Sequence, residues 1–227
     1  MKKIIDDKLP RRSLVTGMGV AIAGLTVSGT TAAQDGQQLS AFQAQRHSED
    51  AWFDELGGSH RVFIDTSTAL GGQDALRYAF NIMNAHGNAY SGSDDDYAMI
   101  VCYRHGSTPF GYGDALWEKY GELLNGRMQL TDPETNETPK RNILNIGQGR
   151  NASTSIDAMV ARGVRFAICA TASRGMAGLI AGRTGQQTDD VYNEIVAGAI
   201  PNARFVSAGV MGVTRAQEYG YSLLYAG

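Results

Sequence analysis

Short apolar runs alternate with helically spaced apolar residues through most of the chain, and this alternation constrains the fold more than any other feature. Residues 61–65, 97–104 and 164–169 have the apolar character of strands. Between the first two and after the second, residues 73–86 and 114–124 carry apolar side chains at helical spacing. Strands that alternate with helices are joined by right-handed crossovers, so the pattern predicts a mostly parallel sheet between two helical layers.

The second half of the sequence continues this alternation. We therefore expect an α/β protein with a three-layer α/β/α fold, in which the sheet has about five strands. Ser153 is expected to cap the first of the later helices. Those helices are predicted over residues 153–162, 173–181, 189–197 and 213–219, and the later strands over residues 204–207 and 221–225.

Two interruptions mark the pattern. Gly71-Gly72 is expected to separate the first strand from the first helix, and residues 125–153 break the rhythm with the turn-rich stretch 131–139. This excursion is predicted to be an exposed hairpin or an irregular segment, and such long connections often serve as lids, binding loops or oligomer contacts. Its glycine-bearing end, residues 145–151, follows no clear strand and matches neither standard glycine fingerprint, which argues against nucleotide binding.

The N-terminal segment is typical of an export signal. It has a charged stretch with the pair Arg11-Arg12, a glycine-diluted apolar run over residues 15–27, and small residues at 31–33. The apolar run is too short for a membrane span, which needs about 20 consecutive apolar residues. An ordinary Sec signal with a chance arginine pair is the alternative, but the moderate hydrophobicity favours the twin-arginine (Tat) type.

These features predict a Tat signal peptide over residues 1–33, a linker or N-terminal arm over residues 34–58, and one domain over residues 59–227. The mature chain is then exported, as to a periplasm, and keeps no stable membrane span. The predicted signal and the rest of the chain differ in net charge. The signal carries five of the 20 Lys and Arg residues and two of the 23 Asp and Glu residues. The remainder has 15 cations against 21 anions, a net charge of −6, which argues against general nucleic-acid binding.

Three strand ends are candidate sites, because ligands of such sheets bind beyond the carboxyl ends of the strands. Residues 65–67 follow the first strand, residues 104–108 the second, and residues 169–175 the third. Cys169 ends an apolar strand shortly before a predicted helix, where backbone N–H groups and the helix dipole favour a thiolate. The sequence therefore offers Cys169 as a reactive thiol, with a buried structural thiol as the alternative.

The chain has two cysteines, Cys102 and Cys169. In an oxidising compartment they can form one disulfide, they can both be buried apolar side chains, or one can be reactive while the other packs. Cys102 lies in the middle of a predicted strand, which favours packing. The sequence does not choose among these arrangements.

Arg104 and His105 stand at the exit of the second strand. A neutral histidine can move protons there, and an arginine can hold a carboxylate, a sulfur oxyanion or a phosphate; a solvated loop pair is the alternative. The remaining histidines, His47, His60 and His86, complete no metal-ligand spacing with His105, and no Gly-x-Ser-x-Gly elbow occurs. The sequence therefore indicates no metal and no cofactor.

Four segments of the chain resemble the DsrE/DsrF-like (YchN-like) family. They are residues 158–169 (AMVARGVRFAIC), 201–210 (PNARFVSAGV) and 216–221 (AQEYGY), together with residues 103–106 (YRHG), which are similar to a strand-end segment of Tat-exported members. The shared pattern is a helix that leads into a Gly-Val strand ending at cysteine, a later strand, and a Gln-x-x-Gly-Tyr approach to the last strand. The resemblance covers most of residues 60–226.

The resemblance implies a compact three-layer fold, frequent homo- or hetero-oligomers and, for some members, sulfur relay through a persulfide on a strand-end cysteine. Cys169 is the position that matches, with a small sulfur species as its ligand and His105 or Arg104 as a proton or anion partner. The better characterised sulfur carriers of the family are cytoplasmic. An exported relative therefore needs either a protected thiol or a different role.

Two other functions fit the same sequence. One is a non-catalytic module for small-ligand binding or assembly, in which Cys169 is dispensable. The other is an unrelated enzyme whose active site uses the loop over residues 104–107, and there Arg104 and His105 would be essential.

Overall fold

The computed structural model describes residues 43–146 and 149–227, and residues 43–227 belong to one compact unit. The predicted signal peptide over residues 1–33 and the first part of the predicted arm lie outside the described residues. No helix in the described ranges combines the length and the hydropathy that a membrane crossing requires.

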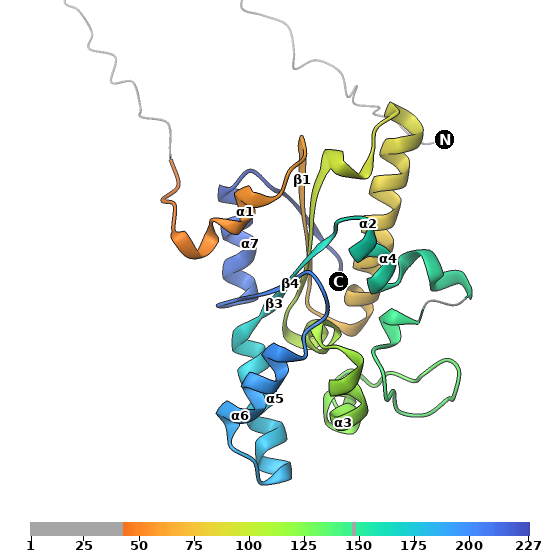
Figure 1. The fold of residues 1–227 in the computed structure, drawn as a ribbon, viewed down its shortest axis with the longest axis vertical. Helices are drawn as coiled ribbons and strands as arrows, with labels where there is room; N and C mark the ends of the chain where they lie inside the picture. Colours follow the sequence, from red (N-terminus) through yellow and green to blue (C-terminus); the bar gives the residue numbers. More distant parts are fainter. Residues whose placement is uncertain (1–42, 147–148) are drawn as a thin grey trace, which may run out of the picture. The chain divides into compact units, whose positions relative to one another are not determined.

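Five parallel strands form one sheet in the order β4-β3-β2-β1-β5 (Figure 1). The central strands β1 and β2 pair along their whole length, from His60 opposite Tyr97 to Thr66 opposite Tyr103. Because all the strands are parallel, their carboxyl ends lie at one edge of the sheet. The strands are β1 (His60–Thr66), β2 (Tyr97–Tyr103), β3 (Arg165–Cys169), β4 (Ala203–Val206) and β5 (Ser222–Tyr225).

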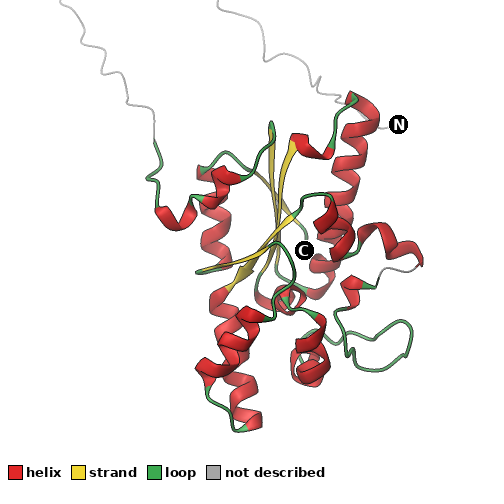
Figure 2. Cartoon of the chain, in the orientation of Figure 1, coloured by secondary structure: helices red, strands yellow, loops and turns green. Residues whose placement is uncertain are grey.

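Helices cover both faces of the sheet, which confirms the predicted three-layer α/β/α class (Figures 1 and 2). On one face, Phe53 of α1 and Ala216 of α7 share a buried cluster with Phe63 of β1. On the other face, Leu76 of α2 packs in a larger cluster with Ile64 of β1, and helices α3 to α6 contribute to it as well. The helices are α1 (Trp52–Glu55), α2 (Ala69–Tyr90), α3 (Asp114–Asn125), α4 (Ile156–Ala161), α5 (Ala170–Thr184), α6 (Thr188–Ala197) and α7 (Gly209–Glu218).

Burial on both faces explains the unbroken apolar run of β2. Successive side chains of a strand point to opposite faces. Met99 and Val101 join the cluster on the α2 side, while Ile100 and Cys102 join the cluster on the α7 side. A side chain of this size contributes about 1.5–3 kcal/mol when it is fully buried, so apolar residues are favoured at nearly every position of this strand.

The first long helix begins earlier than the sequence predicts. Gly71 and Gly72 lie inside α2, whereas we expected them to separate it from β1. Thr68 caps the helix, and its Oγ1 accepts a hydrogen bond from the Gly71 N–H at 2.9 Å. A Cβ atom on Gly71 would lie 1.6 Å from the carbonyl oxygen of Ala226. Glycine is therefore required where the segment after β5 crosses the first turn of α2.

Other helix starts also differ from the prediction, and α7 begins at Gly209, four residues before the predicted start at residue 213. Ser155, and not Ser153, caps α4, and its Oγ accepts the Ala158 N–H at 3.2 Å. Helix α5 begins at Ala170, directly after Cys169, three residues earlier than expected. The connection from β3 to α5 therefore has no loop, and the strand-end cysteine is itself the N-cap of the helix.

The described part of the predicted excursion, after α3, is irregular, as expected, and it is held to the domain at a buried amide. Asn142 is 1% exposed, and its Nδ2 donates to the carbonyl oxygens of Phe110 at 2.8 Å and Tyr112 at 2.9 Å. Its backbone N–H donates to the Asp114 carboxylate at 2.9 Å. These bonds join the excursion to the start of α3. Its described 3-10 turns are η4 (Ile143–Asn145) and η5 (Gly149–Thr154).

The described part of the predicted N-terminal arm, residues 43–58, docks on the sheet through two aromatic side chains. Trp52 and Phe53 of α1 are 6% and 0% exposed. Phe53 contacts the ring of Tyr221, whose hydroxyl donates to the Phe53 carbonyl oxygen at 2.7 Å. Trp52 and Phe53 are therefore packing residues of the domain.

Candidate functional site

The three predicted site residues all lie at the carboxyl edge of the sheet, on the neighbouring strands β2 and β3. Arg104 and His105 follow β2, and Cys169 ends β3. The two strands pair in parallel up to Tyr103 opposite Ile168. The sequence predicts that the three residues lie at one edge of the sheet. Their side chains, however, have different surroundings.

Cys169 has a polar contact that an ordinary core thiol lacks. Its sulfur accepts a hydrogen bond from the Ala172 N–H, with the N and S atoms 3.4 Å apart, in the first turn of α5. The residue is 7% exposed and its thiol is free. The contact fixes the sulfur against the first turn of α5, at the end of the helix where backbone N–H groups point outward.

Cys102 has the opposite surroundings. It is 0% exposed in the core on the α7 side of β2, and its thiol is also free. Burial, with the negative charge of Asp65 nearby, raises the pKa of the Cys102 thiol well above its ordinary value. In the part of the chain that the structure describes, Cys102 is thus a packed, protonated thiol, and no disulfide joins it to Cys169.

Arg104 is held by a carboxylate from the neighbouring strand. Its Nε and Nη2 donate to the two carboxylate oxygens of Asp65, each at 2.8 Å. The Asp65 side chain is only 5% exposed, and these hydrogen bonds raise the pKa of Arg104. A Cβ atom on Gly209 would lie 2.5 Å from the Arg104 Cβ, so a glycine at the start of α7 makes room for the arginine stem. Arg104 is a structural ion-pair partner and does not present a free guanidinium to a ligand.

A buried pair of hydroxyls fixes the turn after β2. This turn is the 3-10 helix η3 (His105–Gly111). Ser107 Oγ lies 2.7 Å from Thr66 Oγ1 and 3.0 Å from the Arg104 backbone nitrogen, which donates to it. Thr66 in turn donates to the Cys102 carbonyl oxygen at 2.7 Å. The hydroxyls tie η3 to the ends of β1 and β2 and so fix where His105 stands.

His105 is exposed and has a left-handed backbone with φ of 52°. The next residue, Gly106, donates its N–H to the Ser67 carbonyl oxygen at 2.8 Å, which holds the turn in place. Among the described residues, no hydrogen bond joins the His105 ring to the Cys169 sulfur, and no residue bonds to both. The structure therefore places His105 with a neighbouring pocket and does not pair it with the thiol.

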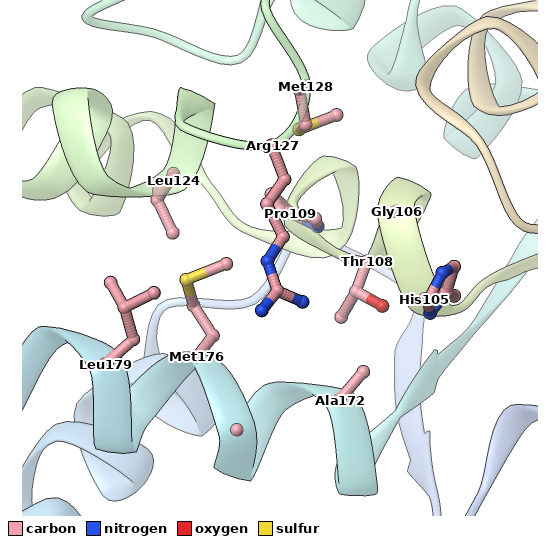
Figure 3. Close-up of a pocket in the computed structure, with 11 residues that line it drawn as sticks. His105, Gly106, Thr108, Pro109, Leu124, Arg127, Met128, Ala172, Met176 and Leu179 are labelled. Carbon is pink, nitrogen blue, oxygen red and sulfur yellow. The ribbon is translucent and has the colours of Figure 1, made fainter.

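That pocket lies between η3, the end of α3 and the first half of α5, and has a volume of about 190 Å³ (Figure 3). One part of its wall is polar and the other is built from Leu and Met side chains. Thr108 and Arg127 belong to the polar part. Thr108 lies in the predicted strand-end segment 104–108, whereas no pattern in the sequence selects Arg127. Its lining residues are His105, Gly106, Thr108, Pro109, Leu124, Arg127, Met128, Ala172, Gly175, Met176 and Leu179.

Neither a metal group nor a relative identifies the site. Among the residues that the structure describes, no group of three or more His, Cys, Asp or Glu side chains is arranged to hold a metal ion. Comparison of the chain with protein-family models, with curated proteins and with solved structures found no match. The resemblance to the DsrE/DsrF-like family stays a prediction from the sequence.

Proposed function

We propose that this domain carries sulfane sulfur on Cys169. The observation that supports the proposal most is the hydrogen bond from the Ala172 N–H to the Cys169 sulfur at the start of α5. The thiolate is the nucleophilic form of cysteine, and a helix N-terminus lowers the energy of that form. Cys102, which has no such contact and a raised pKa, is not expected to take part.

The transfer that we propose needs no external oxidant or reductant. The Cys169 thiolate attacks the terminal sulfur of a donor persulfide, R–S–SH. A new sulfur–sulfur bond forms at Cys169, the sulfur–sulfur bond of the donor breaks, and R–S⁻ leaves with the bonding electron pair. The terminal sulfur keeps its proton, so the product is a Cys169 persulfide, and delivery to an acceptor thiolate is the reverse reaction.

Burial of the sulfur also supports the proposal. An oxidising compartment converts exposed thiolates to sulfenic and higher acids. At 7% exposure, the Cys169 residue is shielded on most sides while a small part of its surface stays accessible. This meets the requirement that an exported sulfur carrier has a protected thiol.

Intact-mass spectrometry tests the proposal with the other cysteine as a matched control. After incubation with glutathione persulfide and removal of excess donor, we expect the wild type and Cys102→Ala to gain about 32 Da, one sulfur atom, and Cys169→Ala to gain none. Dithiothreitol should remove the adduct. An adduct that persists in Cys169→Ala, or a wild type that gains none, would contradict the proposal.

A second candidate function is small-ligand binding without chemistry at the thiol. The pocket beside His105 favours it, because the pocket is built from other residues and does not include Cys169. In that case Cys169→Ser leaves ligand binding intact. An enzyme based on the loop over residues 104–107 is less well supported, since the Arg104 guanidinium already donates two hydrogen bonds to the Asp65 carboxylate.

We also propose export through the Tat pathway, on the sequence of residues 1–33. The test replaces Arg11 and Arg12 together by lysine, which keeps the charge and removes the arginine pair. We expect the wild-type chain in the periplasmic fraction of a Gram-negative host and the variant in the cytoplasm. Unchanged export of the variant would favour an ordinary Sec signal.

A further inference from the structure

The pocket between η3, α3 and α5 contains a buried hydroxyl without a partner. Thr108 is 2% exposed, and its Oγ1 makes no hydrogen bond with any described residue. Tyr103 is the other residue of the described part with such an atom, and its ring lies inside the core. An unsatisfied buried hydroxyl costs about 1–3 kcal/mol, so a ligand acceptor in the pocket that Thr108 lines would relieve this cost. The oxygen itself has almost no accessible surface, and it reaches the pocket by rotation of the short side chain about its Cα–Cβ bond to another staggered position.

The same pocket contains an arginine that no carboxylate holds. Arg127 is exposed, and none of the described residues pairs with its guanidinium, in contrast to the two-bond clamp on Arg104. In Figure 3 the guanidinium of Arg127 points toward α5, between the side chains of Thr108 and Met176. A guanidinium keeps its charge at all ordinary pH values and presents a planar set of donors that matches a carboxylate or another oxyanion.

The electrostatic surroundings of the pocket favour negative charge. No Asp or Glu is among its lining residues, and His105 and Arg127 supply the basic groups. Ala172, in the first turn of the 15-residue helix α5, also lines the pocket. The positive end of the α5 dipole therefore adds to the field of Arg127 at this end of the pocket.

The rest of the wall fits a hydrocarbon. Leu124 and Met128 come from the end of α3 and the turn after it, and Met176 and Leu179 come from α5. Methionine side chains adapt their shape to apolar groups, and each buried CH₂ of a ligand contributes about 0.8 kcal/mol. A volume of about 190 Å³ accepts a compact molecule and excludes a nucleotide or a large cofactor.

We propose that this pocket binds a small organic anion, a carboxylate or sulfonate that carries a short aliphatic chain. The anionic group accepts hydrogen bonds from the Thr108 hydroxyl and the Arg127 guanidinium, and the chain packs against the Leu and Met side chains. This site does not use Cys169 and does not depend on sulfur transfer. It adds a ligand class that the thiol chemistry does not require.

Isothermal titration calorimetry with four probes separates the contributions of the head group and the chain. We expect 1-pentanesulfonate and hexanoate to bind, whereas acetate, which lacks the chain, and 1-hexanol, which lacks the charge, bind at least about tenfold more weakly. The stronger of the two anions identifies which oxyanion the site prefers. Equal binding of 1-hexanol and hexanoate, or no binding of either long-chain anion, would overturn the proposal.

Variants then locate the site. Arg127→Gln and Thr108→Val should each weaken binding of the better anion by about tenfold or more, because each removes a hydrogen bond to a charged group. Arg183→Gln, which makes the same charge change in the last turn of α5, serves as the control and should bind like the wild type. Unchanged affinity in both pocket variants would refute the site.

Two further measurements keep the outcomes distinct. Thr108→Val should be at least as stable as the wild type, because its hydroxyl has no partner to lose, so weaker binding cannot be ascribed to unfolding. Cys169→Ala should bind the anion normally. Normal binding in that variant together with loss of the persulfide adduct would support both proposals independently, and loss of anion binding in it would contradict the separation of the two sites.

Discussion

Arg104 and Arg127 show how two arginines near the same edge of a sheet acquire different roles. Arg104 is fixed by two hydrogen bonds to Asp65, a buried carboxylate on the adjacent strand. Arg127 follows the end of α3, lines a pocket, and has no acidic partner among the described residues. The first arginine is part of the fold, whereas the second is available to a ligand.

The position of a charged residue indicates where a site lies, and its partner decides what the residue does. Arg104 was a reasonable candidate because it follows a strand. Its partner is 39 residues away in sequence and becomes visible only through the register, in which Asp65 lies opposite Cys102.

The largest effect is expected from removal of the carboxylate that holds Arg104. Asp65→Ala leaves a partly buried guanidinium without its partner, and we expect a loss of about 3 kcal/mol in the free energy of unfolding. Urea denaturation followed by circular dichroism measures it. A loss below about 0.5 kcal/mol, the size of an ordinary surface change, would mean that the ion pair is not structural.

Replacement of both members of the pair separates the cost of an unpaired charge from the value of the pair itself. Because a buried ion pair also carries a desolvation penalty, Asp65→Leu combined with Arg104→Met should regain about 2 kcal/mol relative to Asp65→Ala alone. The double variant is compared with each single variant by urea denaturation. If the double variant were less stable than either single one, the apolar side chains would not fit the space and the pair would be needed for its shape.

The fold could be predicted from the sequence because its strands and helices carry local signals. The apolar run of β2 reflects burial on both faces, and the later strands follow from similar short runs. The early start of α2 has a non-local cause. Gly71 was interpreted as a break because glycine disfavours helices, yet its position is fixed by Ala226 from the other end of the chain.

The candidate site could be predicted only in part. The topological rule for parallel sheets located Cys169, Arg104 and His105 at one edge. The pocket could not be predicted, because Arg127 lies in the irregular stretch after α3, where no periodicity shows which way a side chain points. The free hydroxyl of Thr108 is likewise invisible in sequence, since a threonine in a turn is ordinarily satisfied by its neighbours.

A third arginine, Arg162, provides an intermediate case with a pH signature. Its Nε and Nη2 donate to the Asp94 carboxylate at 2.7 and 2.6 Å, and the Asp94 side chain is 37% exposed. These hydrogen bonds lower the pKa of Asp94, so the pair stabilises the fold above the ordinary aspartate pKa of about 3.9 and loses this effect as the pH falls through the lower folded value.

Arg162→Gln should therefore cost about 1 kcal/mol at pH 7, a value reduced by solvent exposure of the pair. The stability gap between variant and wild type should narrow as the pH falls below the ordinary aspartate pKa of about 3.9 toward the lower pKa of Asp94 in the folded wild type. Urea denaturation at several pH values between 7 and 3 measures the gap. A gap that stays constant over this range would assign the effect to packing of the arginine stem instead of its charge.

The smallest effect on stability is expected at Arg127. Arg127→Gln removes no hydrogen bond or ion pair with a described residue, so its free energy of unfolding should stay within about 0.5 kcal/mol of the wild type. The wild type should gain stability when hexanoate is added, by about 2.7 kcal/mol at a hundredfold excess over Kd, and the variant should gain much less at the same concentration. Thermal unfolding with and without hexanoate measures both quantities in one experiment. A variant that loses stability without ligand would show that Arg127, like Arg104, already has a structural role, and the contrast between the two arginines would then fail.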